Sequence, residues 1–490
     1  MNPLFLEFSV VFLGLCLLMI EAFASHLNKK ILAYSAVVGL GIVLLLSFLP
    51  MQAFAVGSPS AGFYATDALA FFFKRFMLVM TMIMILMSVD FIPVIERFVP
   101  GERRGAGVGE FFILPLFACA GLMWLVSAID FIMLFVSLEL MTVVLYILVA
   151  YLRKNTMSLE AGTKYLILSA LATGFLVFGI TWIFGITGTT SITLLASTIA
   201  TLPSSALLPL LFGIAFVLVA FCFKIAAFPF QFWLPDVYQG APTPVTAYLS
   251  VASKAAGFVI LLRLLEQLYV IPILHHKLLA VTTLLAVMTL LFGNLAALPQ
   301  TNMKRLLAYS SIAHAGYILM AVASLGSLLA VPAIGFYLVA YLAMTSLAFL
   351  VLMIVSEASG GDEIYRFQGL HERSPLLAGA MVIAILSLAG LPLSAGFFGK
   401  FFIFQVALQQ HHYGLVGVGS IAVVAGFYYY LKVIRVMYWQ QPAEGVASIS
   451  ISGTAKFLMV FLIATILILG VYPTPLLGAL KIHGMPLILR

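Results

Sequence analysis

The feature that most constrains this chain is a long series of apolar stretches, each able to cross a lipid bilayer as a helix. An α-helix rises about 1.5 Å per residue, so about 20 apolar residues span the hydrocarbon core. Of the 490 residues, 64% are hydrophobic and only 8% are charged, whereas about 25% of a soluble domain is charged. These values exclude a soluble enzyme, a nucleic-acid-binding protein and a disordered chain.

The apolar stretches predict an all-α integral membrane protein with about fourteen transmembrane helices. Their predicted bounds are 4–24, 31–49, 67–88, 110–128, 131–152, 159–185, 206–231, 244–265, 277–298, 304–323, 331–355, 376–409, 414–437 and 454–472. The first stretch has no basic residues before it, so it is expected to remain as an anchor and not to be cleaved as a signal peptide. Three single cysteines show no haem-attachment or iron–sulfur spacing.

Basic residues between the predicted helices indicate how the chain is oriented. Loops after even-numbered helices hold only Lys277, whereas loops after odd-numbered helices hold fourteen Lys and Arg residues. These are Lys29, Lys30, Arg97, Arg103, Arg104, Arg153, Lys154, Lys304, Arg305, Arg366, Arg373, Lys432, Arg435 and Lys456. Because loops rich in Lys and Arg stay in the cytoplasm, both termini are expected on the outer side of the plasma membrane.

Apart from the loop residues, seven basic residues lie inside or at the ends of the predicted helices, and one acidic residue lies at the middle of a predicted helix. The basic residues are Lys74, Arg75, Lys164, Lys224, Lys254, Arg263 and Lys400, and the acidic residue is Glu139. A charge at the bilayer centre costs at least ~2.5–3.5 kcal/mol and usually marks an ion or proton pathway. Four of these residues, Glu139, Lys224, Lys254 and Lys400, lie beyond reach of the membrane surface and are candidate functional residues. The alternative is structural ion pairing, which Glu139 and Lys224 could provide for each other.

The remaining internal charges have simpler interpretations. Lys74, Arg75 and Arg263 lie near helix ends, from which long basic side chains can extend to water. Lys164 follows Glu160 by four residues, a spacing that predicts a local ion pair on one helix face. A role of Lys164 in proton entry is an equal alternative.

Two predicted spans contain helix breakers beside a lysine. Pro229 follows Lys224 in one span, and Gly390 and Pro392 precede Lys400 in the other. Proline removes a backbone hydrogen bond, and in lipid the freed groups need protein or water, so both spans are expected to be broken. Matching breaks predict a transport site, and their offset of five helices predicts inverted repeats. The expected organisation is three helices (1–109), two five-helix repeats (110–265 and 277–437), and a final helix with a tail (438–490).

Long motifs around the candidate residues resemble those of the antiporter-like subunits of respiratory complex I. They include LFVSLEL around Glu139, FKIAAFPFQFWLPDVYQGAPTPVTAYLSVASK from Lys224 to Lys254, and SLAGLPLSAGFFGKF around Lys400. With the length and helix number, they resemble most the N-subunit family of bacterial type I NADH:quinone oxidoreductase. The resemblance covers helices 3 to 13 and implies a proton-translocating subunit in the bacterial inner membrane.

The resemblance also implies roles for single residues. It implies proton transfer by Glu139, Lys224, Lys254 and Lys400, pairing of Glu139 with Lys224, and possible relay by His314 and Lys164. Gln231 stands where many relatives have histidine, so a role of that histidine cannot operate here. Burial disfavours a charged lysine and a nearby carboxylate favours it, so a lysine with a movable carboxylate partner can bind and release a proton.

For cofactors and partners, the resemblance implies none bound in this chain, which has no GxGxxG or phosphate-binding loop. NADH, FMN, iron–sulfur clusters and quinone would belong to partner subunits: the other membrane subunits of complex I and, through them, its peripheral redox arm. Alternatives are a subunit of a sodium/proton antiporter or of a membrane-bound hydrogenase, a stand-alone secondary transporter, and a structural spacer. The type of quinone, and whether sodium replaces the proton, stay open.

Overall fold

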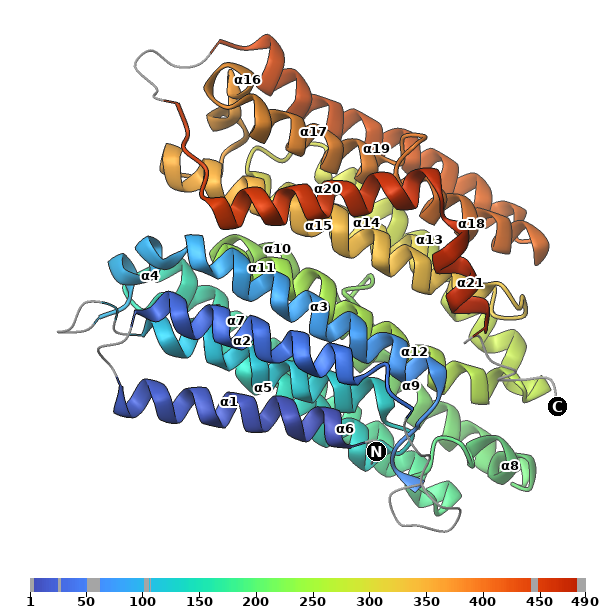
Figure 1. The fold of residues 1–490 in the computed structure, drawn as a ribbon. Coiled ribbons are helices and arrows are strands. Elements are labelled where there is room, and N and C mark those ends of the chain that lie inside the picture. The colour runs from blue at the N-terminus through green and yellow to red at the C-terminus, as the bar shows by residue number, and fades with distance from the viewer. Residues whose placement is uncertain are drawn as a thin grey trace.

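The computed structural model describes residues 4–24, 28–50, 62–100, 105, 107–441 and 448–482. Within these residues the chain is almost entirely helical, and β-structure is limited to three isolated bridges. The long helices run side by side along one common direction (Figure 1). Twelve helical spans are long and apolar enough to cross a membrane, so the chain is a multi-pass membrane protein.

The helices follow the predicted spans closely. The spans are α1 (Phe5–Phe23), α2 (Lys29–Leu46), α3 (Ala68–Asp90), α5 (Val108–Ser127), α6 (Phe131–Val149), α7 (Thr156–Thr187), α9 (Leu207–Ile225), α11 (Thr243–Tyr248) with η3 (Leu249–Ser253) and α12 (Lys254–Tyr269), α13 (Pro272–Ala297), α14 (Met303–Val322), α15 (Ala330–Ser359), α17 (Pro375–Ala389) with α18 (Ala395–Gln409), α19 (Tyr413–Trp439) and α20 (Gly453–Val471). The short elements are α4 (Ile92–Phe98), α8 (Leu195–Ala200), η2 (Ser204–Ala206), α10 (Trp233–Gly240), η4 (Ile364–Phe367), α16 (Leu370–Arg373) and α21 (Thr474–Ile482).

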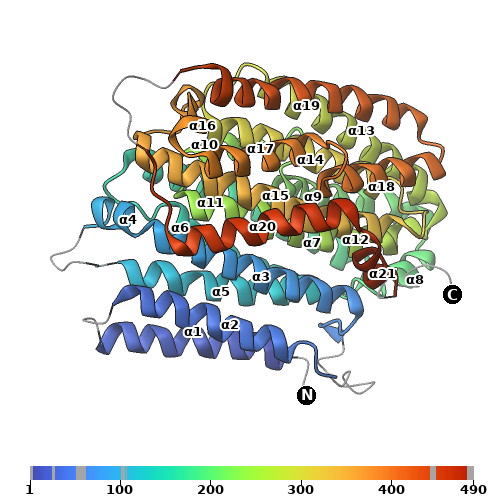
Figure 2. The same ribbon diagram turned by 45° about the horizontal axis from the view of Figure 1, so that its top comes forward.

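The bundle has two distinct ends. Helix α1 begins and α21 lies at one end, here termed the terminal end, whereas α4 and α16 lie at the opposite end (Figure 2). The opposite end is termed the basic end because the described loop residues Arg97, Arg153 and Arg373 belong to it. The terminal and basic ends are therefore separated by the full length of the spanning helices.

The centre of the bundle is formed by α11–η3–α12 and by α15. These spans are almost completely buried, whereas α1, α2 and α7 bury only a stripe of residues and leave apolar side chains exposed. Exposed apolar faces of this kind suit lipid or neighbouring membrane helices. The central helices are thus shielded from lipid and can carry polar residues.

Both predicted breaks are present. Helix α9 ends one residue after Lys224, and Ala226 adopts a left-handed backbone with φ 58° before α10 begins. Helix α17 ends at Gly390, whose φ is 92°, and α18 follows from Ala395. The surrounding helices pair correspondingly, since α5 packs on α6 and α13 on α14, while α7 packs on α9 and α15 on α18.

Neighbouring side chains form hydrogen bonds with backbone groups around the first break. The Trp233 indole Nε1 donates to the carbonyl of Phe223 at 3.0 Å, and the amide of Phe228 donates to Thr289 Oγ1 at 3.0 Å. Such replacement bonds are what make non-helical backbone tolerable at membrane depth.

Two of the three residues expected to extend to the membrane surface do not do so. Lys74 is fully buried and pairs with Glu7 at 3.0 Å, and Arg263, 5% exposed, pairs with Asp67 at 2.7 Å. The prediction was wrong because both carboxylates come from other segments of the chain. Arg75 is partly exposed and donates to the Ser47 carbonyl near its helix end, as expected.

Candidate functional site

Five predicted residues lie on five different helices of the bundle. Glu139 lies on α6, Lys224 on α9, Lys254 at the start of α12, His314 on α14 and Lys400 on α18. Glu139 is partly buried, and the other four are at most 7% exposed. These five residues, in this order, are termed here the Glu/Lys/His row.

The row begins with Glu139 and Lys224, which do not form the expected ion pair. Glu139 accepts a hydrogen bond from Thr173 Oγ1 on α7 at 2.8 Å. Lys224 donates to Thr142 Oγ1 at 3.0 Å, and Thr142 lies about one turn beyond Glu139 on α6. No ion pair within 4.0 Å joins the two charges in the described structure. In the structure the Glu139 carboxylate and the Lys224 amine therefore bind separate threonines and form no direct ion pair.

Lys254 occupies the centre of the row, directly after the π-helical turn η3. Its Nζ donates to the carbonyl of Ser311 at 2.9 Å and to Ser311 Oγ at 2.5 Å. Tyr341 donates to the same Ser311 Oγ at 2.7 Å. A Cβ added to Gly257, one turn along α12, would lie 3.6 Å from Cγ of Lys224. The lack of a side chain at Gly257 thus brings α12 against the neighbouring lysine.

Tyrosines surround His314. Its Nδ1 lies 2.5 Å from the Tyr337 hydroxyl, and its Nε2 lies 3.3 Å from the Tyr430 hydroxyl. Tyr430 also bonds Ser310. A search for intramembrane charges does not find these tyrosines; the run GFYYYLKV near residue 430 was the sequence signal for one of them.

Lys400 ends the row at the second break. Its Nζ donates to the carbonyls of Leu388 at 3.0 Å and Ala389 at 2.8 Å, which belong to the last turn of α17. A cation is favoured there because the helix C-terminus carries partial negative charge. The Tyr317 ring lies 4.9 Å from Nζ. No carboxylate lies within ion-pair distance of Lys400 in the described residues.

Several buried polar atoms beside the row have no hydrogen-bond partner among the described residues. They are both side-chain polar atoms of Gln231 and the hydroxyls of Tyr165 and Tyr317. Tyr165 interacts electrostatically with Glu139. A buried polar group without a partner costs about 1–3 kcal/mol, and ordered water is its usual partner. The row is therefore lined by groups suited to binding water.

Lys164 lies apart from the row, at the basic end. It pairs with Glu160 at 2.7 Å, as predicted, and with Asp236 at 2.8 Å. Arg305 reaches Asp236 from the other side at 2.8 Å. Burial alone would raise the pKa of the Asp236 carboxyl, but the hydrogen bonds and charges of Lys164 and Arg305 hold it below its ordinary value. The carboxylate therefore stays ionised at neutral pH.

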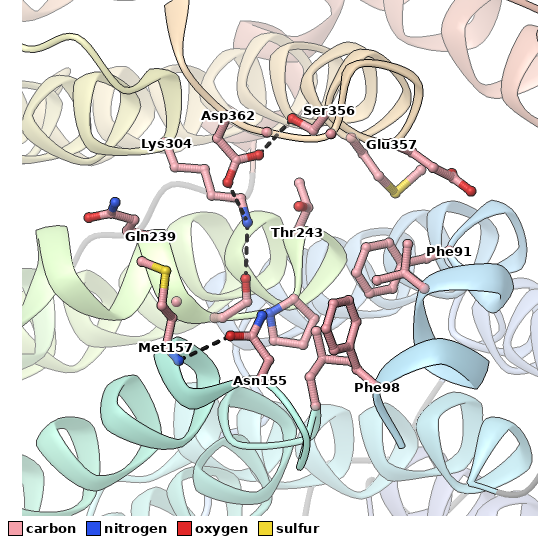
Figure 3. Close-up of a pocket in the computed structure, with 18 of the residues that line it drawn as sticks. Phe91, Phe98, Asn155, Met157, Gln239, Thr243, Lys304, Ser356, Glu357 and Asp362 are labelled. Atoms are coloured by element: carbon pink, nitrogen blue, oxygen red, sulfur yellow. Dashed lines mark hydrogen bonds and ion pairs between the residues drawn. The ribbon is translucent and has the colours of Figure 1, made fainter. Parts of the chain in front are cut away.

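A pocket of about 380 Å³ opens beside this network at the basic end. Figure 3 shows Lys304 reaching across it, with Nζ 3.3 Å from Asp362 Oδ2 and 3.2 Å from the carbonyl of Ala241. Ser356 donates to the other oxygen of Asp362 at 2.6 Å. Thr243, which begins α11, also lines the pocket. The pocket therefore lies at the start of the span that contains Lys254. No group of three or more potential metal ligands occurs in the described residues.

Comparisons with known proteins give matches over nearly the whole chain. The family model described as "NADH:quinone oxidoreductase/Mrp antiporter, TM" matches residues 128–426. The chain is 38% identical over 476 residues to NADH-quinone oxidoreductase subunit N of Moorella thermoacetica, covering 97% of this chain and 96% of that protein. It is also similar to a chain of respiratory complex I from Thermus thermophilus with bound aureothin, at 30% identity and a TM-score of 0.77, covering 96% and 98% of the two chains. A chain of the membrane-bound sulfane sulfur reductase, an archaeal respiratory membrane complex, has the same fold, with a TM-score of 0.86 at 24% identity over 98% and 97% of the chains.

Proposed function

This chain belongs to the NADH:quinone oxidoreductase/Mrp antiporter family of membrane proteins, and on that premise we propose that it is the N-type, proton-translocating membrane subunit of an NADH:quinone oxidoreductase. Electrons pass from NADH through FMN and iron–sulfur clusters to quinone in partner subunits. The observation that carries the proposal is the set of five titratable residues inside the bundle, from Glu139 to Lys400, on five different helices.

The row transfers protons because each lysine can bind or release one. A neutral amine still donates hydrogen bonds, so Lys224, Lys254 and Lys400 keep their partners when they lose a proton. The distance of Glu139 from Lys224 changes the proton affinity of this lysine. At 4 Å and an effective dielectric near 20, two unit charges attract by about 4 kcal/mol, which corresponds to about a thousandfold change in proton affinity. Moving Glu139 toward or away from Lys224 therefore switches the lysine between its two states.

Protons enter from the cytoplasm at the basic end and leave at the outer side through Lys400. The basic loops place that end in the cytoplasm, with both termini outside. Lys164 with its carboxylates and the pocket below Lys304 supply polar groups at the entrance. Water bound to the unpartnered groups along the row connects the titratable residues.

Two inverted five-helix repeats, 110–265 and 277–437, provide the two breaks. The three helices of 1–109 and the region 438–490 flank them. Corresponding packing of helices in the two repeats supports this division. Each half-helix end holds one lysine of the row, so the repeats contribute similar proton sites.

The test is proton pumping by the assembled complex in membrane vesicles, driven by NADH. We expect Lys254→Met to remove the pumping that depends on this chain, because methionine fills the space but binds no proton. Lys277→Met, the same change at an exposed position on α13, is the matched control. The complex purified from its native membrane must also contain redox subunits with FMN and iron–sulfur clusters. Full pumping by Lys254→Met, or co-purification with hydrogenase or antiporter subunits alone, contradicts the proposal.

A further inference from the structure

A second group of buried ionisable residues lies at the terminal end, outside the Glu/Lys/His row. Arg263, near the end of α12, donates from both terminal nitrogens to Asp67 at 2.7 and 2.8 Å. Its Nε donates to the carbonyl of Val126 on α5 at 3.2 Å. Asp67 also caps α3 by accepting from the amide of Ala70 at 2.8 Å. Three helices therefore meet at one guanidinium.

A further acid, Glu266, shares this guanidinium's surroundings. It follows Arg263 by three residues on α12, so the two side chains lie on the same helix face. Glu266 is 2% exposed, and its Oε2 is buried without a hydrogen-bond partner among the described residues. Its carboxyl interacts electrostatically with Arg263 and Asp67. Two carboxyl groups thus compete for one arginine, and in the structure Asp67 holds it.

The charges of the neighbouring residues do not compensate Glu266. Lys74 interacts with Asp67 and Arg263, but its own ion-pair partner is Glu7 at 3.0 Å. The group therefore contains three acids, Glu7, Asp67 and Glu266, against two bases. An uncompensated carboxylate in so apolar a region is costly. One proton bound to the group removes that cost.

The state of Asp67 indicates where this proton resides. Burial alone would raise the pKa of Asp67, but the hydrogen bonds and charge of Arg263 hold it below its ordinary value. Arg263 therefore favours the ionised form of Asp67, which leaves the unpartnered carboxyl of Glu266 as the acid that would carry the proton. The Asp67 side chain is 31% exposed, whereas Glu266 is enclosed. Glu266 is thus the inner acid and Asp67 the outer acid beside the single guanidinium of Arg263.

Helix α12 connects this group to the row. Lys254 begins the helix, and Glu266 follows twelve residues later, about 18 Å along the axis. The group therefore lies between the central lysine and the terminal end. Lys400, the exit proposed above, belongs to the second repeat, whereas α12 belongs to the first. A release site on α12 would therefore serve the first repeat.

We propose that Asp67, Arg263 and Glu266 form a proton-release site for the first repeat at the terminal end. In the loaded state Glu266 carries the proton and Arg263 binds Asp67, which is the ion pair present in the structure. In the emptied state Arg263 binds ionised Glu266, the proton passes to Asp67, and Asp67 gives it to water at the surface. One proton leaves and the charge of the group falls by one. This inference rests on the proposed function, because the row must supply the proton.

The test uses the assembled complex in vesicles and measures protons pumped per NADH oxidised. We expect Glu266→Gln to lose part of the pumping that Lys254→Met removes, because glutamine has nearly the same shape but no proton to release, while the Lys400 exit of the second repeat stays intact. Glu266→Asp should retain pumping, since it keeps the acid. A purely structural role predicts the reverse order, with the isosteric glutamine tolerated better. Full pumping by Glu266→Gln, or equal loss with both replacements, overturns the inference.

Two further sets of variants serve as a control for the type of substitution and as a replacement if a variant does not assemble. Glu372→Gln makes the same change at an exposed acid at the basic end and should pump normally. If Glu266→Gln fails to assemble, Asp67→Asn and Asp67→Glu carry the comparison, and only the asparagine variant should lose pumping. Loss in Lys254→Met together with full pumping in Glu266→Gln and Asp67→Asn refutes the release site and leaves the proposed function intact. Full pumping by Lys254→Met contradicts the proposed function itself.

Discussion

At the scale of single residues, the buried lysines of the row are held by neutral oxygen atoms. Lys224 donates to a threonine hydroxyl, Lys254 to a serine and Lys400 to two backbone carbonyls. A carboxylate would bind the charged lysine tightly and oppose release of its proton. The structural pairs Lys74–Glu7 and Arg263–Asp67 show that contrast within the same molecule. Neutral partners therefore distinguish the lysines of the row from the basic residues paired with acids.

Glu139→Ala and Lys224→Ala should each abolish the pumping that depends on this chain. Without the carboxylate, nothing changes the proton affinity of Lys224, and without the lysine the row is interrupted. Proton uptake by vesicles, normalised to the amount of assembled complex, measures the effect. Glu110→Ala, at an exposed acid on α5, is the control. Wild-type stoichiometry in either test variant would show that the two residues do not act as a switch.

Lys400→Arg should preserve assembly but block proton release. The guanidinium can keep a positive charge against the C-terminal carbonyls of α17, but arginine does not deprotonate in proteins. Pumping per assembled complex is again the measurement, with Lys456→Arg at an exposed position as the control. Unchanged pumping by Lys400→Arg would mean that this lysine is a structural charge.

At the scale of elements, the two broken helices place their lysines by the same principle. Lys224 lies in the last turn of α9, and Lys400 extends back from α18 to the last turn of α17. Each break exposes carbonyls at a helix C-terminus, where a positive charge is stabilised. Gly390 makes the second arrangement possible through its left-handed backbone and through the space beside it. A Cβ there would lie 3.0 Å from Cδ of Lys400.

Gly390→Ala should lower the melting temperature of the complex and reduce pumping. A non-glycine residue in the left-handed region costs about 1–2 kcal/mol, and the added methyl group would displace the lysine. Gly379→Ala is the matched control on α17, because no atom lies within 4 Å of the position of its Cβ; the change should be neutral or slightly stabilising. Equal effects of both changes would argue against a special role of the break.

At the scale of the whole molecule, the polar residues of the row lie at the centre of the bundle, and apolar side chains cover its periphery. The central spans α11–η3–α12 and α15 carry Lys254 and two of the tyrosines near the row, Tyr337 and Tyr341, while the peripheral helices expose apolar side chains. This arrangement reverses that of a soluble domain, because the surrounding lipid is as apolar as the side chains facing it. The polar row is thereby isolated from lipid along its length.

Reporter fusions should place both ends of the chain outside the cytoplasm. Helix α1 begins and α21 lies at the terminal end (Figure 2), and the basic loops belong to the other end. A periplasm-active reporter fused after Arg490 should be active, and the same reporter inserted after Gln440, which follows α19 at the basic end, should be inactive. The opposite pattern would reverse the proposed direction of pumping.

The amino-acid sequence by itself determined the class of fold and most of the row. The lengths of the apolar stretches predicted the helices, because a backbone that crosses lipid must have its hydrogen-bonding groups paired within the protein. Proline beside Lys224, and glycine and proline beside Lys400, marked the breaks. The missing N–H of proline and the conformational freedom of glycine are the same in any surroundings. Charges at mid-membrane depth marked Glu139 and Lys254 as candidate functional residues because a charge there is costly.

Only the tertiary structure decided which partners these residues have. Lys224 contacts Thr142, not Glu139, and Lys254 contacts Ser311. Lys74 and Arg263 are buried because acids from distant segments meet them. A single sequence reveals the hydrophobic cost of placing a charge in the membrane, since that cost depends on depth along one helix. It does not reveal pairing between helices, because side chains far apart in the chain come within a few ångströms only when the whole bundle packs.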